Sequence, residues 1–168
     1  MTRKLVYSGV CAALVAVFTM FPSIPNGVGG YVNLGDAVIA AVVILMGAWG
    51  IPSAAIGSLC ADLILGYVDY APGTFIIKGT MAAVIVAVLF IFRRKKESPL
   101  ATVVALVCSE AVMVGGYFVY EIILFGNAYA VASVIPNVIQ AAAGLAVGCA
   151  LCFVVKKFNL KKLLKIRE

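Results

Sequence analysis

The sequence contains no histidine. This absence excludes metalloproteases of the H-E-x-x-H type, histidine-ligated haem proteins and enzymes that use a histidine general base. The sequence also lacks a G-x-x-x-x-G-K-[ST] phosphate-binding loop, so the chain cannot hydrolyse ATP by itself. Cys149 and Cys152 form a C-x-x-C, but no further ligands stand nearby to complete the four that a zinc site needs. We therefore expect no catalytic residues, no metal site and no cofactor.

Charged residues are scarce as well. They make up 12% of the 168 residues, against about a quarter in a soluble domain, and 64% of the residues are hydrophobic. This composition predicts an integral membrane protein with a single membrane domain, residues 1–168. Apart from Lys78, the basic residues lie in three clusters beside apolar segments, at 3–4, 93–96 and 156–167. Such clusters are typical of the cytoplasmic ends of membrane helices and of contacts with anionic lipid, so we expect no nucleic-acid partner.

Apolar segments long enough to cross a membrane, about 20 residues each, recur along the chain. We predict an all-α bundle of six transmembrane helices with both termini in the cytoplasm, an orientation that places every basic cluster on the cytoplasmic side. Thr74 is a plausible N-cap of the fourth helix. The expected helices are residues 5–21, 34–49, 51–66, 75–92, 100–125 and 128–155, followed by a basic tail at 156–168.

Ionisable and amide side chains gather in the outer half of this predicted bundle, where most of the tyrosines also fall. Charges are costly in hydrocarbon and usually face a bundle interior or a wet cavity. Tyrosine rings could stack on a flat ligand while polar groups bind its edges. We therefore predict a ligand pocket that opens outwards. Its candidate substrate-binding residues are Asn33, Asp36, Asp62, Tyr70, Lys78, Glu110, Tyr117, Glu121, Asn137 and Gln140.

The same polar residues have a purely structural interpretation. Lys78 could form an ion pair with Asp62, which would tie the third helix to the fourth, or with Asp36. Both possibilities stay open beside ligand contact. The amides of the sixth helix could serve as hydrogen bonds between helices. Glu110 and Glu121 are harder to explain by packing, because no second basic residue lies inside the membrane.

Small residues recur every four positions in the first helix. Ser8, Ala12 and Ala16 form one row, and Gly9 and Ala13 form another. Rows of this kind let two helices approach closely. From the spacing alone, packing within the same chain is the favoured interpretation.

Three motifs resemble the substrate-binding S components of energy-coupling-factor (ECF) vitamin transporters. They are Y-V-N-L-G-D at 31–36, G-x-x-x-x-x-x-G-S-L-x-A-D-L-x-x-G-Y at 50–67 and Y-A-P-G-T-F-I-I-K-G at 70–79. The similarity covers essentially the whole chain and is strongest to the branch that includes riboflavin-type, pyridoxine, hydroxymethylpyrimidine and queuosine-precursor proteins. It implies a six-helix bundle whose vitamin site is capped by the loop between the first two helices, here residues 22–33.

The resemblance also implies partners. S components dock onto a transmembrane scaffold subunit that is coupled to two cytoplasmic ATPases, and they use small residues of the first helix to do so. On this chain the docking residues would be Ser8, Gly9, Ala12 and Ala16.

The expected function is therefore that of a substrate-capture subunit of an importer in a bacterial-type plasma membrane, not of an enzyme. An acid-rich pocket with one lysine favours a compact heteroaromatic ligand with donor groups, such as a pyridoxine-, hydroxymethylpyrimidine- or queuosine-precursor-like compound, over a phosphorylated one. Two alternatives remain open. One is a stand-alone proton-coupled carrier that uses Glu110 and Glu121, and the other is a membrane structural protein whose polar residues only hold helices together.

Overall fold

The structure, a computed structural model, describes residues 2–27, 29–92 and 99–163. The predicted basic loop at 93–96 and the end of the basic tail at 164–168 lie outside the described residues. Apart from its connecting loops, the described chain consists of helices and one short antiparallel hairpin, in which Ile24 pairs with Val32 and Pro25 with Tyr31. Its elements are α1 (Thr2–Met20), β1 (Ile24–Pro25), β2 (Tyr31–Val32), α2 (Gly35–Met46), η1 (Gly47–Trp49), α3 (Gly50–Leu65), α4 (Ala71–Phe92), α5 (Pro99–Phe125), α6 (Asn127–Lys157) and α7 (Leu160–Leu163).

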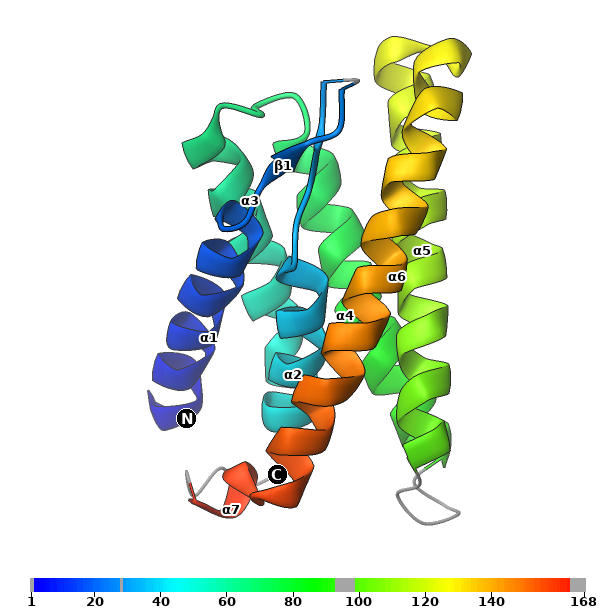
Figure 1. The fold of residues 1–168 in the computed structure, drawn as a ribbon. Coiled ribbons are helices and arrows are strands. Elements are labelled where there is room, and N and C mark those ends of the chain that lie inside the picture. Colours follow the sequence, from blue (N-terminus) through cyan, green and yellow to red (C-terminus); the bar gives the residue numbers. More distant parts are fainter. Residues whose placement is uncertain (1, 28, 93–98, 164–168) are drawn as a thin grey trace.

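The described residues contain five helical segments that are long and apolar enough to span a membrane: Arg3–Met20, Gly35–Leu65, Ala71–Phe92, Pro99–Phe125 and Asn127–Lys157. The second and third predicted helices fall in one of these segments, because η1 joins α2 to α3 without a break. The chain nevertheless reverses direction at η1, so that α2 and α3 run side by side (Figure 1). Gly47 begins this reversal with φ of 61°, a backbone conformation that favours glycine.

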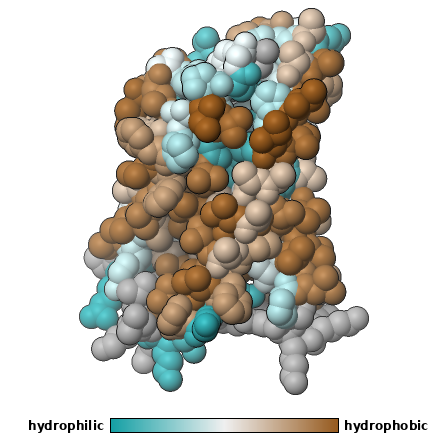
Figure 2. All heavy atoms as spheres, viewed as in Figure 1, coloured by the Kyte–Doolittle hydropathy of each residue, from teal (hydrophilic) through white to brown (hydrophobic). Residues whose placement is uncertain are grey.

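The surface agrees with a membrane location. Figure 2 shows a broad belt of hydrophobic residues across the middle of the face in view, with hydrophilic residues towards both ends. Large apolar side chains such as Phe90, Ile123 and Ile135 are about 70% exposed, at 71%, 74% and 70%. Soluble monomers rarely expose contiguous apolar surface on this scale, so the belt is the part that meets lipid.

Helix α2 is the centre of the bundle. It packs against α1, α3, α4 and α6, and nearly all of its residues are buried. Its 12 residues span only about 18 Å, well short of the about 30 Å of a hydrocarbon core. The hairpin lies beyond the first residue of α2 and covers the remaining depth (Figure 1). This arrangement leaves space beneath the hairpin that no side chain of α2 fills.

The fourth helix begins earlier than the predicted residue 75. It starts at Ala71, because Pro72 fits the first turn of a helix, where its missing N–H costs no hydrogen bond. The prediction that Thr74 caps this helix is therefore wrong. Thr74 lies inside α4, is 2% exposed, and its hydroxyl is 2.9 Å from the hydroxyl of Tyr117 on α5.

The close packing of α1 on α3 depends on Gly57. A Cβ atom at this position would collide with the carbonyl oxygen of Ala12 and would lie 2.9 Å from Cβ of Val15. We expect Gly57→Ala to lower the free energy of unfolding by about 1–3 kcal/mol, because a helix backbone cannot yield cheaply.

Gly115 provides the matched control for this prediction. A Cβ atom there would meet nothing within 4 Å, so Gly115→Ala should stabilise α5 by about 0.5–1 kcal/mol through its higher helix propensity. Thermal unfolding of both variants in detergent measures the difference. Equal melting temperatures would show that α1 and α3 do not pack as described.

Candidate functional site

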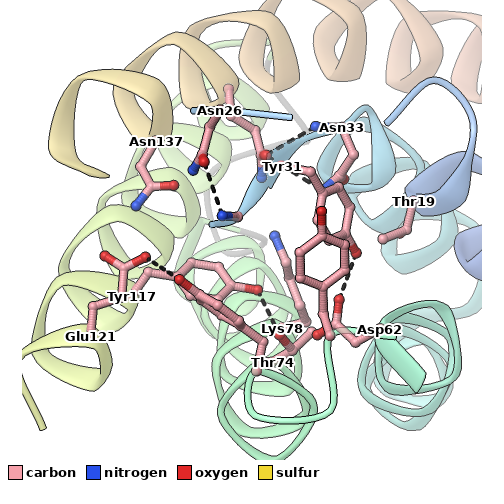
Figure 3. Close-up of a pocket in the computed structure, with 14 residues that line it drawn as sticks. Thr19, Asn26, Tyr31, Asn33, Asp62, Thr74, Lys78, Tyr117, Glu121 and Asn137 are labelled. Atoms are coloured by element: carbon pink, nitrogen blue, oxygen red, sulfur yellow. Dashed lines mark hydrogen bonds between the residues drawn. The ribbon is translucent and has the colours of Figure 1, made fainter. Parts of the chain in front are cut away.

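A pocket opens at the hairpin end of the bundle, in the space above α2. Residues from five helices and the hairpin converge on it (Figure 3). The described ends of the chain, α7 and the start of α1, lie at the opposite end of the molecule (Figure 1). The pocket is lined by Thr19, Asn26, Gly30, Tyr31, Asn33, Asp62, Tyr67, Tyr70, Thr74, Lys78, Tyr117, Glu121, Asn137 and Gln140.

Lys78 lies at the floor of the pocket and forms a buried ion pair. Lys78 donates to Asp36 Oδ1, and the side chains are 2% and 0% exposed. The sequence left two partners open for Lys78, Asp62 and Asp36, and the ion pair forms with Asp36 from the first turn of α2. The Lys78 Nζ atom also lies 5.3 Å from the centre of the Tyr117 ring, within the range of a cation–π interaction.

Gln140 connects this ion pair to the hairpin. Its amide Nε2 donates to Asp36 Oδ2 at 2.7 Å, and its Oε1 accepts from the backbone N–H of Asn33 at 3.0 Å. Asn33 follows β2 directly, so the hydrogen bonds lead from the hairpin through Gln140 to Asp36 and Lys78. Gln140 therefore forms a hydrogen bond between α6 and α2 and also lines the pocket.

Two tyrosine hydroxyls hold carboxylates at the pocket wall. Tyr31 donates to Asp62 Oδ1 at 2.6 Å, and Tyr70 donates to Glu121 Oε1 at 3.1 Å. Burial, followed by the charge of Asp62, raises the pKa of the Tyr31 hydroxyl far above its ordinary value. Burial and the hydrogen bond with Tyr129 raise the pKa of the Tyr70 hydroxyl likewise. Both phenols therefore stay neutral and keep their protons for donation.

The aromatic side chains form a continuous wall. The ring centres of Tyr31 and Tyr67 are 4.7 Å apart, those of Tyr67 and Tyr70 are 6.3 Å apart, and those of Tyr70 and Tyr117 are 6.3 Å apart. Tyr129 extends the wall towards the hairpin, since its hydroxyl is 2.8 Å from that of Tyr70 and its oxygen lies against Gly29. Such a wall presents ring faces and hydroxyl groups to whatever enters the pocket.

The structure places most of the predicted substrate-binding residues around this one pocket. The exceptions are Asp36, which lies under the floor, and Glu110, which is 7% exposed and packs close to Gly144. Six lining residues were not among the candidates. Tyr31 and Tyr67 belong to the outer group of tyrosines, and Asn26 and Gly30 belong to the loop at 22–33 that is expected to cap the site, so these four could have been chosen on those grounds. Thr19 and Thr74 give no distinct signal as pocket residues in the sequence.

The predicted docking residues on α1 separate into two groups. Ser8 and Ala16 are 6% and 8% exposed and face the interior; the Ser8 hydroxyl is 2.8 Å from that of Ser53 on α3. Ala12 is half-buried, with its carbonyl directed at Gly57. The row of small residues thus packs against α3 within the chain, so Ser8 and Ala16 are buried in this structure. Gly9 lies on the outer face of α1, with open space beside it.

Within the described ranges, no group of three histidine, cysteine, aspartate or glutamate side chains is placed to hold a metal ion. The polar groups of the pocket are instead the hydrogen-bonding and ring-stacking groups that fix the orientation of a small organic molecule.

Comparison with known proteins is consistent with such a site. Residues 1–157 match the family model of the ECF-type riboflavin transporter, S component. The chain is also 33% identical, over 145 residues, to a protein of Pyrococcus woesei named "Uncharacterized protein in gap 3'region"; the alignment covers 85% of this chain and 95% of that protein. S components are substrate-binding transport subunits of vitamin transporters and not enzymes. This chain belongs to the ECF-type riboflavin transporter S component family and is a multi-pass membrane protein.

Proposed function

We propose that the chain captures a small heteroaromatic vitamin or vitamin precursor in the pocket at the hairpin end. The observation that carries this proposal is the pocket itself, in which a wall of tyrosine rings faces carboxylates, amides and one lysine. Flat rings stack on tyrosine, and the polar groups match the edges of a nitrogen heterocycle. Pyridoxine-, hydroxymethylpyrimidine- and queuosine-precursor-like compounds are the ligands we favour.

The proposal assigns ligand contacts to the lining residues predicted from the sequence. Asp36 and Glu110 take supporting roles, because neither lines the pocket. The pocket faces the outside of a bacterial-type plasma membrane, six spans cross that membrane, and both termini are cytoplasmic. A scaffold subunit and two ATPases complete the importer, and they supply the phosphate loop that this chain lacks.

Two measurements test this function. The purified chain in detergent should bind one compound of a vitamin panel, including riboflavin, without any partner. Uptake of that compound by cells should require the scaffold and both ATPases, and should stop when the phosphate-loop lysine of the ATPases is replaced.

The competing function is the proton-coupled carrier that uses Glu110 and Glu121, two buried carboxylates with one unpartnered oxygen each among the described residues. A carrier of this kind would continue uptake with inactive ATPases and would stop when a protonophore is added. A chain that binds no compound and supports no uptake would instead be a structural protein.

A further inference from the structure

Two carboxylates, Asp62 and Glu121, line the pocket, and neither forms an ion pair among the described residues. Figure 3 shows Glu121 of α5 on one side of the pocket, Asp62 of α3 on the other, and Lys78 of α4 between them. Lys78 forms an ion pair with Asp36, which lies beneath the pocket. Apart from Lys78, the basic residues of the described chain belong to its two terminal segments, at 3–4 and 156–162, at the other end of the bundle.

Glu121 is surrounded by uncharged groups. Among the described residues neither Glu121 nor Asp62 forms an ion pair, because Lys78 pairs with Asp36. The groups that act on Glu121 are the hydroxyls of Tyr70 and Ser133, which carry no charge. A carboxylate that is 2% exposed without a cation is costly, since burial removes its water and nothing charged replaces it.

Glu121 also has unused hydrogen-bonding capacity at the pocket. Its Oε1 accepts from Tyr70. Its Oε2 is buried with the Ser133 hydroxyl as a neighbouring donor, but the two form no hydrogen bond of good geometry, so this oxygen can still accept one. Buried polar atoms in folded proteins nearly always have a partner. An open acceptor on a charged group at a pocket wall is what a ligand with a positively charged donor would fill.

We propose that the pocket selects a flat heteroaromatic ligand that carries a protonated primary amine, and that Glu121 binds this amine. The inference rests on the proposed function and names the ligand class of the same site. The ammonium group supplies both the charge and the donors that Glu121 lacks, and it sits within reach of Asn137 on α6, the neighbouring lining residue on that side of the pocket (Figure 3).

The remaining groups suit the ring of such a ligand. Tyr31, Tyr67, Tyr70 and Tyr117 offer faces for stacking, and Lys78 keeps N–H donors for an acceptor on the ring. The Asp62 carboxylate lies at the opposite edge of the pocket, where it suits a ring N–H or an exocyclic amino group. Ligands that carry a carboxylate or phosphate are disfavoured by the same two acidic residues.

Matched pairs of compounds test the amine directly. The pairs share one ring and differ in one substituent: pyridoxamine and pyridoxine, 5-aminomethyl- and 5-hydroxymethyl-4-amino-2-methylpyrimidine, and 7-aminomethyl- and 7-cyano-7-deazaguanine. Binding to the purified chain is measured by calorimetry, with riboflavin as the reference for a ligand without an amine. On the ring that binds, the amine should bind about 10-fold tighter or more, as expected for a charge-assisted hydrogen bond.

Two variants locate the amine. Glu121→Gln should bring the ratio of the two affinities close to one while the neutral compound still binds, which also shows that the variant is folded. Asp62→Asn should weaken both members of the pair and preserve the ratio. The assignment to Glu121 would be overturned if the preference for the amine over the neutral compound were lost in Asp62→Asn and retained in Glu121→Gln.

The outcomes separate this inference from the function on which it rests. If riboflavin or a neutral member of a pair binds as tightly as the amines, the inference is overturned and the capture function stands. If none of the compounds binds, riboflavin included, both are overturned.

Discussion

Replacing Lys78 with methionine should lower the free energy of unfolding by about 3–5 kcal/mol, the usual cost of leaving one member of a buried ion pair without its partner. Asp36 would then be a fully buried carboxylate whose remaining partner is the neutral amide of Gln140. Denaturation of the variant in mixed micelles, with detergent composition as the variable, measures this loss.

A second substitution should restore much of the stability. Asp36→Asn in the Lys78→Met background removes the uncompensated charge and keeps an oxygen for Gln140, so the double variant should be markedly more stable than Lys78→Met alone. Lys156→Met is the control. Lys156 is exposed and donates to the Thr102 hydroxyl at 2.7 Å, an interaction worth about 1 kcal/mol or less. A Lys78→Met protein with unchanged stability and lost ligand binding would mean that Lys78 serves the ligand rather than the fold.

Gly9→Trp should abolish uptake and leave ligand binding intact. Gly9 lies on the face of α1 that points away from the bundle, between the exposed side chains of Leu5 and Val10. Figure 1 shows α1 at the edge of the molecule, where a scaffold helix can approach it. An indole at this position would hold such a helix away by several ångströms. The pocket residue Thr19 is ten positions further along α1, or about 15 Å, so the pocket should not sense the change.

Gly115→Trp is the matched control, because Gly115 of α5 also has open space beside it. It should reduce neither binding nor uptake. Uptake of the ligand by cells and calorimetric binding to purified protein are compared for both variants. Normal uptake by Gly9→Trp would place the docking surface elsewhere, and lost binding would show that the substitution acts on the pocket.

The helical, membrane-embedded character of the chain could be predicted from the sequence because it follows from composition and from the length of apolar segments. The exact ends of the helices could not be predicted in the same way. Thr74 has the residue type of an N-cap, but Pro72 also fits a first turn, and the longer helix is the one that forms. Whether α2 and α3 count as one span or two depends on the turn at Gly47, which hydropathy does not describe.

Most of the pocket residues could be predicted from the sequence, because charged and amide side chains inside apolar helices usually face the bundle interior or a cavity. Which of them pair with one another could not be predicted. Asp36 and Asp62 are both on helices next to Lys78, and the choice depends on helix rotation, which periodicity leaves free. The same limit explains the row from Ser8 to Ala16. Its spacing predicts close helix packing, and only the structure shows that the neighbour is α3 of the same chain.

Because α2 is short, the residues that pack the helices together and the residues that line the pocket lie at different depths in the bundle. The apolar cluster around α2, which includes Val15, Ile39, Val43 and Leu106, shares no residue with the pocket lining above it. Substitutions of pocket residues that form no buried ion pair, such as Asn137, should therefore leave the packing of this cluster largely unchanged. A lineage with this architecture can exchange one cargo for another by altering a few side chains beneath the hairpin, and can inherit its scaffold unchanged.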